Sequence, residues 1–484
     1  MKSSTIILSL FLGLVTNSTT LFAQTYLKID AIEYGLKGDG KTDNTAAFRK
    51  LSQFINQQGG NVVVTFSKGT YLAGIQRTDL KREGFFLSAE DVFELSMVKN
   101  VTINGEEGTI FKYNMGLFFG SFSVPEMKPL VVTRDFYTPG SAAYVGNFIK
   151  LKQCQNVAIQ QIILDGNADA SIAGGVYGDV GIQIPYTGIY IENCLNISMI
   201  DLKSINFGLD GCQIANAPRT DGKSDDVLMA NCEFSLNGRQ GLSWVRGNQF
   251  LAKNCRFNLT GKGKYSSNPG AGVDLEAEDG FVRNGHFINC VFENNSGCGL
   301  VSETGNVSDC RFDSCTFIGV TNWSVWVRKP AFTFFDCKIY GSGVHGYDAA
   351  DDYNATKFIR CLFSDELYQK KTATYGTFLF ESNGVKKLTF DSCIFEAKYK
   401  KLIWLEGNPA WPSNDYYKVT NSILCIESAL PNSEYYAVLR KVQILNNNWQ
   451  IGASIQKNKN YAAGFDSEHS INILRQNKID RKSP

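Results

Sequence analysis

A short motif, in which a cysteine is followed two positions later by an aromatic or aliphatic residue, recurs through the second half of the chain. It occurs at Cys232/Phe234, Cys255/Phe257, Cys290/Phe292, Cys315/Phe317, Cys337/Ile339, Cys361/Phe363 and Cys393/Phe395. The intervals between successive cysteines are 23, 35, 25, 22, 24 and 32 residues. A short minimum interval with variable insertions is typical of a solenoid, and a unit of this length holds about three short strands. The motif therefore predicts an all-β chain folded as a parallel β-helix.

The same spacing indicates what the 13 cysteines do. Residues two apart on a strand point to the same side, and successive coils lie about 4.8 Å apart, so the motif forms an internal file of thiols and rings. Reduced cysteine packs as a small hydrophobe. A disulfide framework is the less favoured alternative. Because the chain has 3 histidines and no Cys-x-x-Cys pair, we predict no metal centre built from thiols.

The first 23 residues have the pattern of a secretory signal peptide. Lys2 supplies a positive start, residues 6–15 are apolar, and Ala23 precedes a plausible cleavage point. The apolar run is too short to span a membrane, so we expect a secreted protein, free or on the cell surface. Lys and Arg number 48 against 47 Asp and Glu, which gives no basic field for nucleic acid.

The start of the mature chain combines a glycine-rich turn with an amphipathic helix. Thr42 or Asp43 is the expected N-cap, and Gly59-Gly60 is expected to end the helix. Between them lies an apolar stripe at helical spacing, formed by Ala47, Phe48, Leu51, Phe54 and Ile55. A short helix of this kind is what the exposed apolar end of a solenoid needs as a cap.

Residues 31–75 resemble the N-terminal module of the pectate-lyase-like superfamily, which includes rhamnogalacturonase and epimerase-type β-helices. The matching pieces are Tyr34-Gly35, Gly38-Asp39-Gly40, Thr42-Asp43, Thr45-Ala46-Ala47-Phe48, Gly59-Gly60 and Gly69-Thr70-Tyr71. The resemblance implies a right-handed parallel β-helix and extracellular glycan chemistry, without identifying a reaction. In that superfamily the opening segment is structural, so Asp39 and Asp43 are interpreted as turn and cap residues.

We expect one main domain, a β-helix over residues 24–445 that includes the cap at 31–75. Residues 106–145 interrupt the repeat with Pro and Gly, and long insertions of this kind usually wall a binding groove. The polar segment 446–484 is interpreted as a last coil followed by a loosely attached tail.

A second motif places a glycine just before a strand in successive coils, at Gly188, Gly211, Gly241, Gly272 and Gly299. The residue after each glycine is expected to point inward, and those two and four positions after it outward. The outer strip then gathers charged, amide and indole side chains: Asp210, Arg239, Gln240, Arg246, Asp274, Glu276, Glu303, Trp326 and Arg328. Their convergence over adjacent coils favours a functional strip over an ordinary solvated surface.

Glycoside hydrolysis of a polysaccharide is the favoured reaction, because it needs two carboxyl groups flanking the scissile bond. Asp210, Asp274 and Glu276 are the candidates for acid and base. Asp210 and Asp274 are expected to lie two coils apart, about 10 Å between backbones. Leu209-Asp210-Gly211 is similar to part of the Asn-Thr-Asp-Gly element of polygalacturonase-type hydrolases, without its Asn-Thr. Arg239, Gln240, Arg246, Glu303, Trp326 and Arg328 would bind the glycan, and no cofactor is needed.

Two alternatives stay open. A lyase or epimerase acting on uronates would use Arg239 or Arg246 as the base, with Asp274, Glu276 and Glu303 holding Ca²⁺. A non-catalytic glycan-binding surface protein would use Trp326 with Trp323, and Trp404, as stacking platforms for sugar rings.

Overall fold

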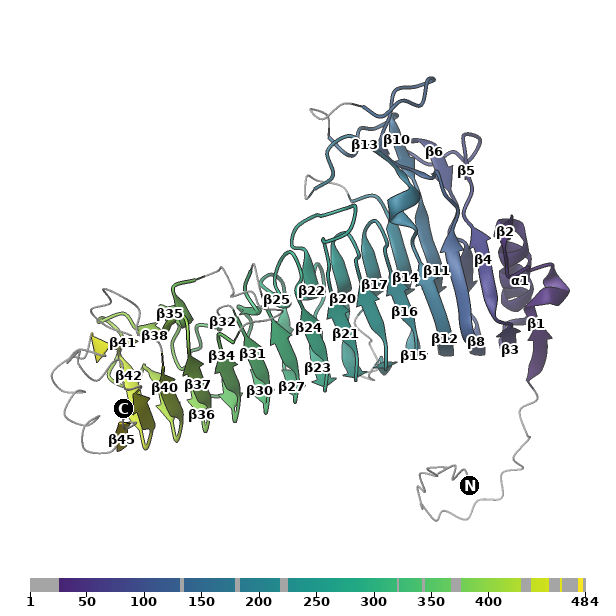
Figure 1. The fold of residues 1–484 in the computed structure, drawn as a ribbon. Helices are drawn as coiled ribbons and strands as arrows, with labels where there is room; N and C mark the ends of the chain where they lie inside the picture. Colours follow the sequence, from purple (N-terminus) through teal and green to yellow (C-terminus); the bar gives the residue numbers. More distant parts are fainter. Residues whose placement is uncertain are drawn as a thin grey trace, which may run out of the picture.

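The computed structural model describes residues 26–130, 135–178, 183–217, 225–319, 322–341, 344–366, 376–427, 437–451, 462–463 and 478–481. The signal peptide expected at residues 1–23 and most of the segment 452–484 lie outside them. The chain forms one elongated solenoid with its N- and C-terminal coils at opposite ends (Figure 1). Each coil contributes up to three short strands, and each strand pairs in parallel with the corresponding strand of the next coil. The fold is a right-handed parallel β-helix, as the sequence predicted.

One face of the solenoid, called here the groove face, carries the strip of residues expected to be functional. Its strands are β7 (Phe93–Ser96), β11 (Gly146–Lys152), β14 (Tyr186–Glu192), β17 (Asp210–Ala215), the first part of β20 (Gln240–Lys253), β22 (Ala271–Leu275), β25 (Leu300–Ser302), β29 (Val325–Val327) and β32 (Val344–His345). A separate parallel sheet continues beyond β32, with β35 (Phe378–Asn383), β38 (Lys401–Glu406), β41 (Ala437–Arg440) and β44 (Ala462–Ala463).

The other two faces complete the coils. The second face holds β1 (Leu27–Asp30), β3 (Gly60–Phe66), the first parts of β8 (Lys99–Tyr113) and β12 (Gln155–Asp165), β15 (Leu195–Ile200), β18 (Val227–Ala230), the end of β20, β23 (Val282–Ile288), β26 (Val307–Ser308), β27 (Cys310–Asp313), β30 (Phe332–Phe335), β33 (Lys357–Ile359), β36 (Thr389–Asp391), β39 (Tyr417–Thr420) and β42 (Val442–Leu445). The third holds β2 (Asp39–Asp43), β4 (Gly69–Ala73), the ends of β8 and β12, β16 (Lys203–Ile205), β19 (Glu233–Ser235), β21 (Arg256–Asn258), β24 (Val291–Glu293), β28 (Thr316–Ile318), β31 (Lys338–Tyr340), β34 (Leu362–Ser364), β37 (Ile394–Ala397), β40 (Ile423–Ile426), β43 (Asn448–Ile451) and β45 (Lys478–Arg481).

The recurrent cysteine motif forms the interior of the third face. Phe234, Phe257, Phe292 and Phe317 follow one another in register and are buried, with stacked ring centroids 4.5–5.4 Å apart. All 13 cysteines are free thiols, and 12 of them are buried. The prediction of a reduced internal file, rather than a disulfide framework, agrees with this packing, in which the thiols fill space among the rings.

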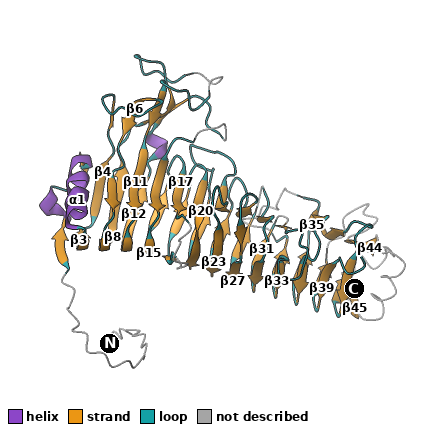
Figure 2. Ribbon diagram, turned by 180° about the vertical axis from the view of Figure 1, so that it is seen from behind, coloured by secondary structure: helices purple, strands orange, loops and turns teal. Residues whose placement is uncertain are grey.

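The N-terminal end is covered by α1 (Thr45–Gln58), which buries Phe48, Leu51 and Ile55 and ends at Gly59 in the left-handed conformation. The N-cap is Asn44 rather than Thr42 or Asp43, because the first helical hydrogen bond runs from the Phe48 N–H to the Asn44 carbonyl. The Asn44 side chain bonds to the preceding loop instead of capping the helix. Short 3₁₀ turns, η1 (Ala31–Tyr34) and η2 (Ala168–Ala170), lie in the connecting segments. Figure 2 shows α1 against the first coils.

A small side sheet rises from the N-terminal third of the solenoid, beside the groove face (Figure 1). Its strands come from three separate insertions: β5 (Gln76–Arg77), β6 (Phe85–Ala89), β9 (Phe118–Ser121), β10 (Ala142–Tyr144) and β13 (Ile172–Gly174). The groove-forming insertion expected at residues 106–145 thus supplies only part of this wall, since residues up to Tyr113 belong to β8 of the solenoid.

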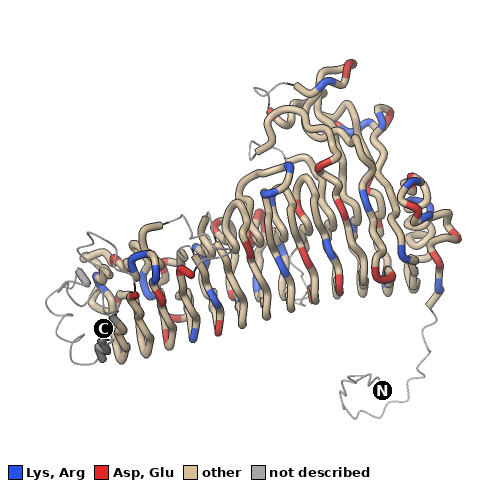
Figure 3. Tube along the Cα trace, viewed as in Figure 1, with Lys and Arg blue, Asp and Glu red and all other residues tan. Residues whose placement is uncertain are grey.

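No helix in the described part of the chain is long and apolar enough to cross a membrane. Acidic and basic residues alternate along the described part of the trace, without a continuous band of either sign (Figure 3).

Candidate functional site

The register of the groove face is the one expected from the glycine motif. Ile189, Cys212, Leu242, Val273 and Leu300 pair in sequence from coil to coil and are buried. The next position of each strand forms an outer column that runs Lys150, Tyr190, Gln213, Ser243, Asp274, Val301, Trp326 and His345. Asp210 and Asp274 lie two coils apart, as predicted, because β17 pairs with β20 and β20 with β22.

Asp210 and Arg239 form a buried ion pair behind the column. Arg239 donates from Nε to Asp210 Oδ1 at 3.0 Å and from Nη2 to Oδ2 at 2.5 Å. The Asp210 side chain is 0% exposed and that of Arg239 15%. Burial alone would lower the pKa of Arg239, but the charge and hydrogen bonds of Asp210 raise it above its ordinary value. Asp210 is therefore sequestered, with both carboxylate oxygens occupied by the guanidinium.

Asp274 is also buried, at 5% exposure, although its strand position faces outward. The Gln240 amide donates to its Oδ2, and Ser243 and Val301 occupy the neighbouring places in the column. Burial first, and then the negative charge of Glu276, raise the pKa of Asp274 well above that of an ordinary carboxyl. The neutral form has a hydrogen-bond partner available, because Gln240 Oε1 is buried and has no partner among the described residues. Turning the amide would let a protonated Asp274 donate to it.

The remaining charged residues of the predicted strip engage separate partners. The Thr304 hydroxyl donates to Glu276, Arg246 pairs with Asp279 at 3.0 Å, and Glu303 pairs with Arg328 at 2.9 Å. Asp274, Glu276 and Glu303, the carboxylates considered for Ca²⁺, are thus each directed to a different group. No group of three or more His, Cys, Asp or Glu in the described ranges is placed to hold a metal ion.

A cavity of about 480 Å³, called here the polar cleft, opens beside the buried ion pair, between the side sheet and the groove face. It is lined by Tyr144, Asn147, Lys150, Gln183, Pro185, Tyr190, Glu192, Leu209, Gln213, Arg239 and Glu278. Arg239 is the one residue of the predicted strip in this lining. β10 supplies Tyr144 from the side sheet, and β11 and β14 supply Lys150, Tyr190 and Glu192.

The positive and negative side chains of the polar cleft differ in whether they have an ion-pair partner. Both cations among its described lining residues are paired with buried carboxylates: Lys150 with Asp91 at 3.1 Å, and Arg239 with Asp210. The two carboxylates, Glu192 and Glu278, have no ion-pair partner among the described residues. Burial first, and then the negative charge of Glu192, raise the pKa of Tyr190, and Glu278 adds to the increase, so both carboxylates lie within electrostatic reach of this phenol.

Glu192 and Glu278 were not among the residues singled out as catalytic. Glu192 lies four residues after Gly188, where the strand period places it on the outer side, but it was not predicted to act in catalysis. Glu278 lies three residues beyond the end of β22 in an exposed bend, where strand periodicity makes no prediction. Its position in the cleft depends on how the turn after β22 folds back along the face.

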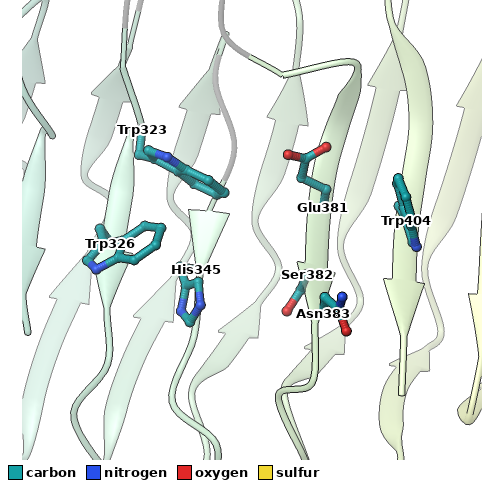
Figure 4. Close-up of a pocket in the computed structure, with 7 residues that line it drawn as sticks. All are labelled: Trp323, Trp326, His345, Glu381, Ser382, Asn383 and Trp404. Carbon is teal, nitrogen blue, oxygen red and sulfur yellow. The ribbon is translucent and has the colours of Figure 1, made fainter. Parts of the chain in front are cut away.

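Trp326 lies in a different cavity, of about 300 Å³, at the far end of the groove face. This tryptophan pocket is lined by Trp323, Trp326, His345, Glu381, Ser382, Asn383 and Trp404 (Figure 4). The structure therefore divides the single strip expected from the sequence into a buried polar cluster, a set of surface ion pairs and an aromatic pocket.

In fold, the chain is a right-handed parallel β-helix of the kind implied by its N-terminal segment. No family model matches the sequence. It is 25% identical over 307 residues to the uncharacterized protein YclG of Bacillus subtilis (strain 168), covering 58% of this chain and 45% of YclG. It is 28% identical over 198 residues to the SPbeta prophage-derived uncharacterized protein YomE of the same organism, covering 38% and 28%. The chain thus spans less than half the length of these relatives.

Two solved structures illustrate the likeness of fold. The A-module of mannuronan C-5 epimerase AlgE6 from Azotobacter vinelandii aligns with 94% of this chain and 100% of its own, at 11% identity and a TM-score of 0.48. A hyperthermoactive exopolygalacturonase from Thermotoga maritima aligns with 88% of this chain and 87% of its own, at 14% identity and a TM-score of 0.35.

Proposed function

We propose that the protein hydrolyses a polysaccharide at the polar cleft, with Glu192 and Glu278 as its pair of catalytic carboxyl groups. The observation that carries the proposal is that these carboxylates share one cavity without an ion-pair partner in the described structure, while the two cations of the described lining are already neutralised. Glycoside hydrolysis uses such a pair, one carboxyl group donating a proton to the leaving oxygen while the other activates water or attacks the sugar carbon.

The charge balance of the cleft argues for a neutral sugar. A uronate needs a cation to offset its carboxylate, and proton abstraction next to that carboxylate increases the need. Among the described lining residues, Lys150 is neutralised by Asp91 and Arg239 by Asp210. The ionised member of the Glu192 and Glu278 pair adds negative charge. An anionic sugar would therefore be repelled more strongly than a neutral one.

The other lining residues would position the sugar. The phenols of Tyr144 and Tyr190 offer ring faces and hydroxyl groups, and the amides of Asn147 and Gln213 can bond to sugar hydroxyls. Arg239 lines the cleft while Asp210 holds its guanidinium in a fixed orientation. Asp210 is thus assigned a positioning role. Asp274 lies within electrostatic reach of Arg239 and belongs to the buried surroundings of this ion pair.

A test uses the full chain and a panel of polysaccharides: xylan, galactomannan and laminarin as neutral polymers, and polygalacturonate and alginate as uronates. We expect new reducing ends from at least one neutral polymer, with no ultraviolet-absorbing unsaturated product. Glu192→Gln and Glu278→Gln should each lower kcat by about 10²–10⁴-fold, the usual contribution of a general acid or base. Glu107→Gln, which changes an exposed carboxylate of β8 away from the cleft, should have no effect.

Two results would contradict the proposal. Unsaturated uronate product, lost on addition of EDTA, would instead indicate a calcium-assisted lyase. Full turnover in both Gln variants would place the reaction outside the cleft.

Action on a polysaccharide also fits the expected export of the chain. The proposed cleavage after Ala23 predicts a mature N-terminus at Gln24, which Edman sequencing or mass spectrometry of protein recovered from the culture medium or periplasm would detect.

A further inference from the structure

The outer column of the groove face ends in an aromatic cluster that the proposed reaction does not use. Trp326 and His345 are adjacent in register on β29 and β32, with ring centroids 4.4 Å apart. Trp323 packs edge-on against Trp326 at 5.0 Å. On the following strands, Glu381 of β35 and Trp404 of β38 are also register partners. In Figure 4 the carboxylate of Glu381 lies between the Trp323–His345 group and Trp404.

The tryptophan pocket has the two kinds of surface that a sugar ring requires. A pyranose offers an apolar face of C–H groups and a rim of hydroxyls, and such ligands are held by aromatic faces with a few polar groups around them. The three indoles are partly exposed and supply the apolar faces. Glu381 and the exposed Asn383 supply acceptors and donors at the rim. The Trp404 indole is fixed in place, because its Nε1 donates to Glu406 at 2.9 Å and its ring packs on Phe378.

The charge of the pocket selects against acidic sugars. Lys and Arg are absent from its described lining, and the nearby Arg328 is paired with Glu303. His345 does not supply a cation at neutral pH, because burial lowers its pKa. With Glu381 as the one acidic side chain, the pocket favours a neutral ring, which is also what the polar cleft favours.

The two cavities lie on the same line along the solenoid axis. Between Tyr190 at the cleft and Trp326 at the pocket, the outer column passes through Gln213, Ser243, Asp274 and Val301, which makes five coil-to-coil steps. At about 4.8 Å per step the separation is about 24 Å. A polysaccharide lying along the groove face would reach both.

We propose that the tryptophan pocket is a second carbohydrate-binding site, which holds neutral sugar rings of the same polysaccharide that is cut at the polar cleft. The statement that both cavities bind the same substrate rests on the proposed function. The statement that the tryptophan pocket binds carbohydrate can be tested without any turnover. It assigns the protein a long polymeric substrate rather than a short oligosaccharide, since only a polymer gains from contacts at both places.

The binding test is native gel electrophoresis through gels containing xylan, galactomannan or laminarin, with polygalacturonate and alginate as acidic comparisons. Glu192→Gln is used as the parent protein so that the polymer stays intact. We expect at least one neutral polymer to retard the parent. Trp326→Ala and Trp404→Ala should weaken that binding by about five- to tenfold each, as expected for loss of one aromatic stacking contact. Tyr399→Ala, which removes an exposed aromatic ring outside the pocket, should bind like the parent.

The outcomes separate the two proposals. If no polymer retards the parent, or if both Trp variants bind as the parent does, the tryptophan pocket is not a carbohydrate site, whatever the chain hydrolyses. If the Trp variants lose binding while the wild type releases no reducing ends from any polymer, the pocket inference stands as a binding site and the hydrolase proposal fails. Asn383→Ala, at an exposed position, gives a further test if either Trp variant misfolds, and should also weaken retardation.

Discussion

The buried ion pair between Asp210 and Arg239 has an exposed counterpart in the same solenoid, so the effect of burial can be measured directly. Arg360 donates to Asp336 from Nε at 2.8 Å and from Nη2 at 2.7 Å, the same two-pronged geometry. Their side chains are 56% and 48% exposed, against 15% and 0% for Arg239 and Asp210. Any difference between the two pairs therefore reflects the surroundings rather than the geometry.

Asp210→Asn removes the charge and keeps the shape, which leaves the Arg239 guanidinium buried without a counter-ion. Breaking a buried pair in this way costs about 3–5 kcal/mol of unfolding free energy. Asp336→Asn leaves an exposed guanidinium that water solvates, so its cost is expected to be much smaller. Urea unfolding followed by far-ultraviolet circular dichroism should show a large fall in midpoint for Asp210→Asn and a small one for Asp336→Asn.

A double variant separates two contributions to the lost stability: the missing ion pair, and the cost of a buried Arg239 guanidinium without a counter-ion. Adding Arg239→Met to Asp210→Asn removes the unpaired cation, so much of the lost stability should return. Equal midpoints for Asp210→Asn and Asp336→Asn would refute the reasoning. So would a double variant that is less stable than Asp210→Asn, because Arg239 would then contribute through packing and not through its charge.

Three further predictions concern the buried carboxyl, the thiols and the asparagine turns. The pKa of Asp274 is raised in the folded state, so its contribution to stability is full below about pH 4, the unfolded pKa, and declines as pH rises toward the folded pKa. At pH 8, Asp274→Asn should therefore unfold at a higher urea concentration than the wild type. At pH 5 this difference in urea midpoint should shrink. In the native protein Ellman's reagent should react slowly, and first at Cys298, because this partly exposed thiol has a pKa that burial raises to about 12. All 13 thiols should react in guanidinium, and fewer than 13 would indicate disulfides. Asn156 has φ +56 and links Asn100 to Asn196 by side-chain hydrogen bonds, so Asn156→Ala should cost about 2–3 kcal/mol from backbone strain and lost bonds, and Asn156→Gly about 1–2 kcal/mol less than that.

The register of the solenoid was predictable because it depends on local patterns that repeat. A cysteine two residues before a phenylalanine, or a glycine just before a strand, needs only the two-residue period of a strand to place it, and both registers are confirmed. A second file was missed: Phe287, Phe312, Phe334, Phe358 and Phe390 stack in register inside the second face. Phe312 carries the cysteine motif but belongs to this file, which explains why Cys310 and Cys315 lie so close in sequence.

The burial of individual site residues could not be predicted from the repeat in the same way. The strand period says which side of a strand a residue faces, but not whether another segment covers that side. Asp274 faces outward and is nevertheless buried, because Gln240, the first residue of β20, lies against it and donates to its Oδ2. Glu278 reaches the polar cleft from a bend, and Tyr144 reaches it from the side sheet. Both positions depend on non-local contacts that no repeat encodes.

This difference explains why the candidate sites lie at two ends of one continuous column. Every coil presents a similar outward position, and the two candidate cavities lie where something rises beside the face: the side sheet around Tyr144, and the bulky indoles near β29 and β38. Between them, at Ser243, Asp274 and Val301, the column is buried and offers no free charge or ring to a ligand. A polysaccharide on this face would thus be held at two separated places with a weakly interacting stretch between them. Affinity should then rise in two steps with chain length, the second when the chain becomes long enough to span about 24 Å, or five strand spacings.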